Sequence, residues 1–378
     1  MKRAIAVLLC ICCIIIFMCG CGQQRKENGI GNGWEPIDTM NLGYAKQFSV
    51  DYYDGGYKLI SLADGSRFLV VPEGAKLPKG ISKDIVPLYQ PIKNIYLAAT
   101  SAMCLFDALD RLDSIRLSGT REDGWYIQNA VKAMQNGDIL YAGKYSEPDY
   151  EMIIDNSCSL AVESTMISHA SDVKKKLESL GIAVLIDQSS HETHPLGRTE
   201  WIKLYGALLN EEEKADELFE QQVSYLDEIA KAESTGKTAA FFHISSSGLV
   251  VTRKTGDYVS KMIELAGGKY IFDNLGDRDK ATSTVTVEME SFFAKAKDAD
   301  IIIYNSTIGG EIKTMDEFVR LNDLLKNFKA VQTGNVWCTG QNMFQETMQL
   351  GKMIQNFHII FTNEDPSLTD LEYLHKLK

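Results

Sequence analysis

The sequence predicts an α/β protein in which two lobes with mostly parallel sheets are joined by a long helix and preceded by a β meander. Three observations predict this fold. Short apolar strands alternate with amphipathic helices in two long stretches, which is typical of parallel sheets. A strongly helical segment separates the two stretches. The chain of 378 residues is too long for one ordinary core, so we expect two lobes.

The first residues resemble a lipoprotein signal peptide. A basic pair precedes an unbroken apolar run, Ala4 to Phe17, which is short for a membrane span. Gly20 then precedes Cys21 as in a lipobox, so we expect residues 1–20 to be removed and Cys21 to carry the lipid. A plain secretory signal and a short membrane anchor are the alternatives. Residues 21–40 are polar and glycine-rich and predict a flexible tether.

The charge and the cysteine content of the chain argue against two kinds of protein, those that bind nucleic acid and those built on disulfides or cysteine-bound metal. The formal charge of −12 and the absence of a basic stripe argue against a nucleic-acid partner. Beyond the signal and Cys21, only Cys104, Cys158 and Cys338 remain. Three scattered cysteines do not form a disulfide framework or a metal-binding Cys pair, so we expect them to be small buried side chains.

Residues 41–92 predict a β-rich extension. Apolar and polar residues alternate between 46 and 71, and two Asp-Gly turns divide this segment into three strands of a meander. A connector with four prolines leads to the first lobe.

The two lobes are predicted for residues 93–209 and 237–365. The expected strands lie at 94–99, 114–119, 160–164 and 182–187 in the first lobe, and at 238–244, 299–305 and 335–340 in the second. Amphipathic helices separate these strands, as a parallel sheet requires. Residues 366–378 are expected to be a tail.

A helical connector is predicted between the lobes. Pro195 suits the first position of one helix. Asn210 and Glu213 resemble a capping box that starts the connecting helix of residues 210–236. About 22 helical residues would span about 33 Å, enough to run from one lobe to the other.

Four stretches in this order resemble the helical-backbone class of substrate-binding proteins of ABC importers, which includes vitamin B12, ferric-siderophore and haem receptors. They are DYEMIIDNSCSLAVEST, TGDYVSKMIELAGGKYIF, MESFFAKAKDADIIIYN and LLKNFKAVQTGNVWCTG. The resemblance covers about residues 94–365. It implies a lipid-anchored receptor, outside the cytoplasm, that passes a small ligand to the permease and ATPase subunits of an importer. It also implies little lobe motion, and we expect a monomer without a cofactor.

The ligand is expected in a cleft between the lobes, at loops that follow the carboxyl ends of strands. Aromatic and arginine side chains in these loops suit an iron chelate, haem or a cobalamin-like complex. The candidate ligand-binding residues are Arg121, Trp125, Tyr126, Tyr145, Ser164, Thr165, Met166, His191, Ser245, Ser246, Arg253, Asn305, Ser306, Thr307, Asn342 and Phe344. Trp125 and Tyr126 carry this expectation most strongly, because two large aromatics in a loop need a partner surface.

The resemblance also implies one glutamate on each lobe that docks on arginines of the permease. Glu151 in the first lobe and Glu290 in the second occupy the matching helix starts, with Glu288 as an alternative to Glu290. Acidic residues also occur in first helical turns simply because they complement the helix dipole.

The segment HETHPLGRTEW raises the alternative of a receptor for bare zinc or manganese. His191, His194 and His243 would be its ligands. The spacing argues against it, because His191 and His194 are three apart and Pro195 keeps the preceding residue out of a helix. We therefore expect this segment to cap the helix that follows, with Arg198 paired to Glu192 or Glu200.

Two other function classes remain as alternatives. A secreted enzyme would need a catalytic motif, but the sequence has no GxSxG, P-loop or GxGxxG pattern. A structural or adhesive lipoprotein would not need two matched α/β lobes. Ligand retained on purified protein would favour a receptor, and turnover of a substrate would favour an enzyme.

Overall fold

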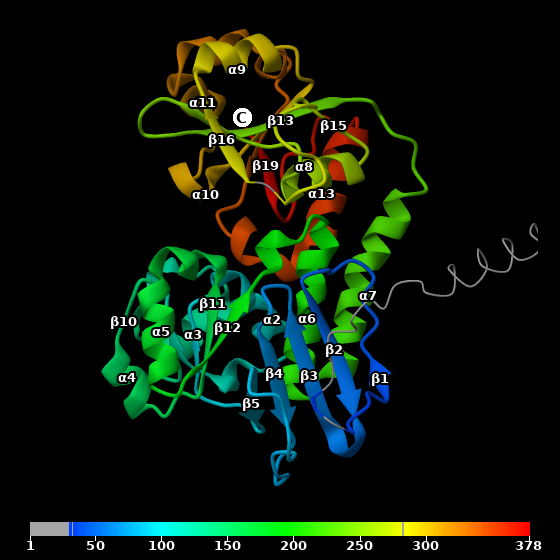
Figure 1. Ribbon diagram of the computed structural model, residues 1–378. Helices are drawn as coiled ribbons and strands as arrows, with labels where there is room; N and C mark the ends of the chain where they lie inside the picture. The colour runs from blue at the N-terminus through cyan, green and yellow to red at the C-terminus, as the bar shows by residue number, and fades with distance from the viewer. Residues whose placement is uncertain (1–29, 32, 282) are drawn as a thin grey trace, which may run out of the picture.

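The computed structural model describes residues 30, 31, 33–281 and 283–378. The predicted signal peptide and Cys21 lie outside this part of the chain. Figure 1 shows two α/β lobes, one above the other, with the β-rich extension packed beside the lower, first lobe. The predicted fold class of two α/β lobes preceded by a β meander is confirmed. In the described residues, no helix is both long and apolar enough to cross a membrane.

The extension forms a five-stranded sheet in the order β1-β2-β3-β4-β5. The predicted meander is its centre, with antiparallel pairing from β2 to β4, while β5 runs parallel to β4. The sequence pattern missed the two outer strands, because β1 is very short and β5 contains a proline. The strands are β1 (Asp38–Thr39), β2 (Phe48–Tyr53), β3 (Tyr57–Leu62), β4 (Arg67–Val71) and β5 (Ile85–Tyr89).

Lobe one contains a parallel sheet in the order β12-β11-β6-β7-β8. A small hairpin, β9 (Gly143–Lys144) and β10 (Glu147–Pro148), precedes α4. The sheet strands are β6 (Ile95–Leu97), β7 (Ile115–Ser118), β8 (Leu140–Tyr141), β11 (Leu160–Ser164) and β12 (Ala183–Asp187). The α-helices are α2 (Met103–Ala108), α3 (Gln128–Gln135), α4 (Tyr150–Asp155) and α5 (Ser171–Ser179).

Lobe two contains a mixed seven-stranded sheet with parallel β13, β15, β17 and β18 at its centre. The antiparallel strands β14, β16 and β19 were missed, and β19 belongs to the segment that we expected to be a tail. The strands are β13 (Thr238–Ile244), β14 (Val250–Arg253), β15 (Lys269–Tyr270), β16 (Thr284–Val287), β17 (Ile301–Tyr304), β18 (Val336–Thr339) and β19 (Leu374–Lys376). The helices are α8 (Tyr258–Leu265), α9 (Met289–Ala296), α10 (Ser306–Gly309), α11 (Met315–Arg320), α12 (Lys329–Gln332) and α13 (Leu350–Thr362).

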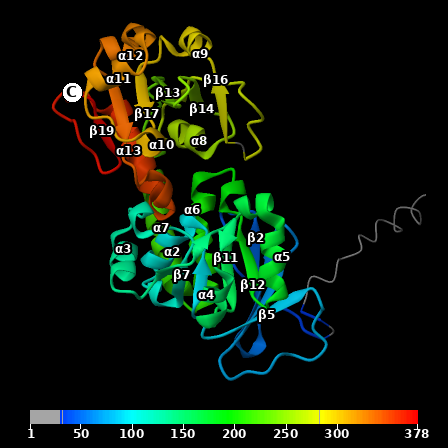
Figure 2. The ribbon, with the colours of Figure 1, turned by 90° about the vertical axis from the view of Figure 1, so that its left-hand side faces the viewer.

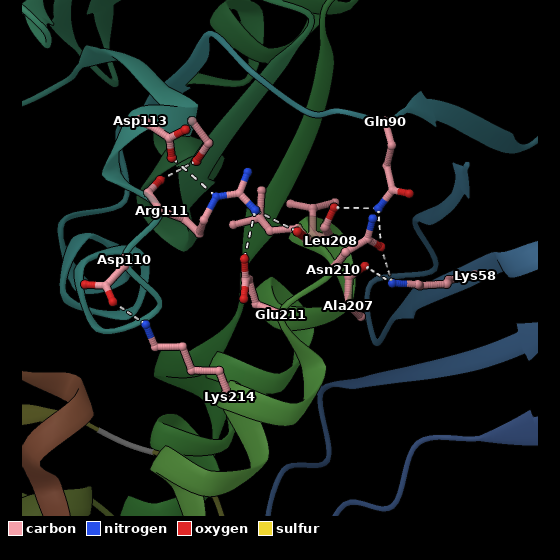
Figure 3. A network of polar contacts seen from close by, with 12 residues as sticks. Lys58, Gln90, Asp110, Arg111, Asp113, Ala207, Leu208, Asn210, Glu211 and Lys214 are labelled. Carbon is pink, nitrogen blue, oxygen red and sulfur yellow. Dashed lines mark hydrogen bonds and ion pairs between the residues drawn. The ribbon is translucent and has the colours of Figure 1, made fainter. Parts of the chain in front are cut away.

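Two helices join the lobes: α6 (Pro195–Leu209) and α7 (Glu212–Ile229). The 18 residues of α7 span about 27 Å. The predicted capping box is wrong, because Asn210 ends α6 in a left-handed conformation and its side chain does not cap α7. Figure 3 shows that the Asn210 oxygen instead accepts hydrogen bonds from Lys58 and Gln90 of the extension. The turn between the helices is thus fixed by the extension.

Helix α6 is buried on almost every side, with only Arg198 partly exposed among its residues. One side packs against lobe one, and the inner face of the extension covers another. Phe48 of β2, for example, packs edge-on against Trp201 with ring centroids 5.1 Å apart. The extension is therefore part of the lobe-one core.

Two buried carboxylates attach the start of the extension to this helix. Glu200 accepts hydrogen bonds from three consecutive backbone N–H groups of residues 43–45, at 2.7 to 2.8 Å. Glu192 accepts two more from residues 46 and 47, at 3.0 Å, and one from the Trp201 indole. Both carboxylates are almost fully buried, and these donors replace the water that each has lost. We call these contacts the carboxylate anchor.

Removing one carboxylate of this anchor should destabilise the whole protein. Glu200→Ala removes a buried carboxylate and leaves three N–H groups of residues 43–45 without their acceptor, so we expect a loss of about 3–5 kcal/mol in the free energy of unfolding. Urea denaturation followed by circular dichroism measures it. The control Glu217→Ala, at an exposed position of α7, should change stability by less than about 0.5 kcal/mol. Equal urea midpoints for Glu200→Ala and the wild type would contradict the assignment.

Candidate functional site

The candidate site lies where the two lobes meet, beside α6. In lobe one, the carboxyl end of β11 leads into the turn before α5 and that of β12 into the turn before α6; in lobe two, β14 leads towards α8. Figure 2 shows α6 at the junction of the lobes, below α8 and α13. Loops at the carboxyl ends of parallel strands are common binding positions in α/β proteins, so side chains from these elements define the site.

Arg198, in the first turns of α6, connects the two lobes. Its guanidinium carbon lies 3.8 Å from the centroid of the Tyr258 ring in lobe two, which is a cation–π contact. One terminal nitrogen donates to the carbonyl of Ser190 at 2.9 Å, while its buried Nε has no hydrogen-bond partner among the described residues. The expected pairing of Arg198 with Glu192 or Glu200 is wrong, because both carboxylates are used by the carboxylate anchor.

Arg253 ends β14 and is almost fully buried. Its guanidinium carbon lies 4.9 Å from the Phe344 ring centroid, and Nη1 lies 3.5 Å from Oδ2 of Asp257. Asp257 also caps α8 by accepting from the Val259 N–H at 2.9 Å. Burial raises the pKa of the Asp257 carboxyl, while Arg253 and Arg198 act in the opposite direction. The site therefore contains two arginines, the partly exposed Arg198 and the buried Arg253, with an aromatic ring against each.

A polar contact closes one side of the junction. The Gln345 side chain accepts from the Tyr126 N–H at 2.8 Å and donates to the Gly124 carbonyl at 2.7 Å. The Tyr126 hydroxyl in turn donates to Gln341 at 2.9 Å. Loops of both lobes, after β7 and after β18, are thus joined directly.

Several predicted site residues have other surroundings. Trp125 is 5% exposed, packs in the lobe-one core and donates to the Ser118 hydroxyl, so it is not a free loop aromatic. Arg121 lies over the Tyr141 ring at 4.2 Å, beside a surface hollow of about 510 Å³ in lobe one. Tyr145 lies in the turn of the β9–β10 hairpin.

The remaining predicted residues divide into two groups. Asn305 and Ser306 are buried and serve the local structure, since Asn305 caps α10 by accepting from Thr307 and Ser306 bonds to Thr339. The others are partly or fully exposed, namely Ser164, Thr165, Met166, His191, Ser245, Ser246, Thr307, Asn342 and Phe344.

The histidines have separate roles. His194 caps α6, because its Nδ1 accepts from the Leu196 N–H at 3.1 Å, and its ring lies 4.6 Å from that of Tyr44. The prediction that HETHP caps the following helix is confirmed. His191 is exposed, whereas His243 is buried on β13 with a pKa lowered by burial and by Arg253. In the described part of the chain, no cluster of three or more His, Cys, Asp or Glu side chains is arranged to hold a metal ion.

Sequence reasoning missed Arg198, Tyr258 and Gln345. The useful signal for Arg198 was its position on a mostly apolar helix, where a cation needs a specific partner. Tyr258 and Gln345 gave no such signal, because their role depends on which loops the two lobes bring together.

Comparison with known proteins gives consistent results. A family model described as periplasmic binding protein matches residues 122–343, more than half of the chain. Two uncharacterized lipoproteins of Methanocaldococcus jannaschii are each 26% identical to the chain; one alignment covers 91% of this chain and 89% of the relative, the other all of both. Among solved structures, the petrobactin-binding protein YclQ of Bacillus subtilis has a TM-score of 0.60 at 14% identity, covering 82% of this chain and 99% of that one. The periplasmic haem-binding protein HutB of Vibrio cholerae has a TM-score of 0.58 at 16% identity, covering 70% and 98%.

The cap formed by His194 should make stability depend on pH. Burial lowers the pKa of His194 from 6.5 to about 4. The unfolded chain therefore binds a proton that the folded chain does not between these two values, and this contribution to stability is lost as the pH falls from above 6.5 towards 4. Urea midpoints measured across this range should fall less in His194→Asn, which keeps a capping acceptor but does not titrate. Parallel curves for the two proteins would contradict this role.

Proposed function

The chain belongs to the periplasmic binding protein family, and on this premise we propose that it is a lipid-anchored receptor that captures an iron chelate or a cobalamin-like complex for an ABC importer. The geometry that supports this best is the junction of the lobes, where Arg198 and Arg253 meet Tyr258 and Phe344. The solved neighbours bind haem and petrobactin according to their names, and the curated relatives are lipoproteins. The two solved neighbours are named as binding proteins, which favours a binding function over an enzyme.

The proposed ligand is an anionic chelate. An arginine guanidinium can donate two hydrogen bonds at once to carboxylate or catecholate oxygens, and aromatic rings supply a flat apolar contact surface. The buried Nε of Arg198, which has no partner among the described residues, offers one donor at the lobe junction. A bare transition-metal ion is disfavoured, because Nδ1 of His194 is already used to cap α6.

Delivery to the permease is proposed to use Glu151 and Glu290. Glu151 lies in the first turn of α4 and Glu290 in the first turn of α9, so each lobe contributes one. Both side chains are exposed, and neither forms an ion pair within the described residues. Two carboxylates on separate lobes would fix the orientation of the receptor as well as attract arginines of the permease. Glu288, the alternative, is also exposed.

Ligand capture can be tested by titrating the purified protein with haem, a ferric catecholate siderophore and cobalamin, and following the ligand absorbance. We expect one of them to bind, and Arg253→Gln to weaken that binding at least about tenfold, or about 1.4 kcal/mol. The control is Arg278→Gln, at an exposed arginine of lobe two. Binding of free Zn²⁺ or Mn²⁺ but of none of the chelates would contradict the proposal.

Docking can be tested by reversing both charges. The double variant Glu151→Lys with Glu290→Lys should abolish uptake of the ligand by cells and leave its affinity for the purified protein unchanged. A matched double variant, Glu213→Lys with Glu364→Lys, reverses two other exposed glutamates and should transport normally. Transport at the normal rate by the first variant, also after Glu288→Lys is added, would show that these glutamates do not dock.

A further inference from the structure

The place where the N-terminal segment joins the folded body is well defined. Ile30 is fully buried beneath the outer face of the extension sheet, among Tyr53, Leu59 and Val71. Its carbonyl accepts from the N–H of Ser82, and Gly31 forms a β-bridge with Ile81. A Cβ on Gly31 would lie only 2.3 Å from the Gly80 carbonyl oxygen, so the two segments approach as closely as glycine allows. The loop 72–84 therefore lies directly beside the start of the described chain.

This loop has an unusual surface for an acidic protein. Lys76, Lys79 and Lys83 are exposed, and none of them forms an ion pair within the described residues. The exposed Leu77 lies between them. Of its two acidic residues, Glu73 and Asp84, the latter is paired with Arg67 at 3.2 Å. A chain with a formal charge of −12 thus presents a small cationic and apolar loop next to its N-terminal segment.

Aromatic side chains continue this surface. Trp34 is partly exposed and packs edge-on against Tyr57, with ring centroids 5.3 Å apart. The Tyr57 hydroxyl donates to the carbonyl of Lys76 at 2.6 Å, which joins the aromatic pair to the loop. Trp and Tyr side chains are favoured at membrane–water interfaces, where one end is apolar and the other is hydrated. We name Trp34, Tyr57 and the loop 72–84 together the basal patch.

We propose that the basal patch contacts anionic lipid headgroups of the membrane to which the chain is anchored. The inference rests on the proposed lipidation of Cys21. Ile30 is nine positions after Cys21 in the sequence, and even a fully extended chain over nine positions reaches only about 30 Å. The basal patch therefore stays near the bilayer surface, where lysines are attracted to anionic lipid within about 10 Å at moderate salt. The contact holds the undocked receptor with its extension towards the membrane.

The fluorescence of Trp34 provides a direct test. The other three tryptophans, Trp125, Trp201 and Trp337, are at most 5% exposed. The full lipidated protein is reconstituted into phosphatidylcholine vesicles with and without phosphatidylglycerol, in which the lipids carry brominated acyl chains that quench nearby tryptophan. We expect part of the tryptophan emission to be quenched in the anionic vesicles and a smaller part in the neutral vesicles. The variant Trp34→Phe should show no such quenching in either.

Charge reversal distinguishes lipid contact by the basal patch from a general electrostatic attraction of the protein to anionic vesicles. The triple variant Lys76→Glu, Lys79→Glu, Lys83→Glu should lower the quenching to the level of Trp34→Phe. A control triple variant reverses Lys280, Lys313 and Lys326 of lobe two, which are also exposed and each lie near a carboxylate, and should behave like the wild type. Absence of quenching in wild-type protein that floats with the vesicles, or equal loss in both triple variants, would overturn the proposal.

Flotation of the same samples tests the lipid anchor independently. Cys21→Ala should no longer float with neutral vesicles, whereas the wild type should. If both float equally, the proposed lipidation is wrong, while the quenching in anionic vesicles still decides whether the basal patch touches lipid.

Discussion

The structure depends on the hydrogen bonds that hold two buried carboxylates, Glu192 and Glu200. Glu192 and Glu200 keep their place because five backbone N–H groups of residues 43–47 and one indole point at them. A buried carboxylate without such donors would cost several kcal/mol. The same contacts give the backbone of residues 43–47 its acceptors. The extension and α6 therefore stabilise each other, and neither is complete alone.

Helix α6 connects the carboxylate anchor to the rest of the molecule. On one side it holds the extension, and through Tyr205, which donates to Asp187 at 2.6 Å, it holds the end of β12. Arg198, near its start, reaches Tyr258 of lobe two. A single buried helix thus sets the position of three parts, which explains how side chains from both lobes can be held at the candidate site.

The sequence predicted the fold better than the site. Alternation of apolar strands and helices identified both lobes and the meander, because burial imposes a period that can be read locally. Asn210 was misread because a left-handed helix end and a helix start favour the same residue. Trp125 was misplaced because a loop aromatic can be buried by its own lobe. Arg198 and Gln345 act through contacts across the lobes, and such contacts have no local pattern.

The carboxylate anchor also fixes an order of assembly. Residues 43–47, between β1 and β2, precede the glutamates that they contact by 145 to 157 residues. A chain that emerges from its N-terminus must therefore present five strands with an apolar face well before the helix that covers them exists. During this time the unpaired backbone groups at the edges of these strands can form hydrogen bonds with other chains. Until residue 200 has been added to the chain, these strands lack the helix that covers their apolar face.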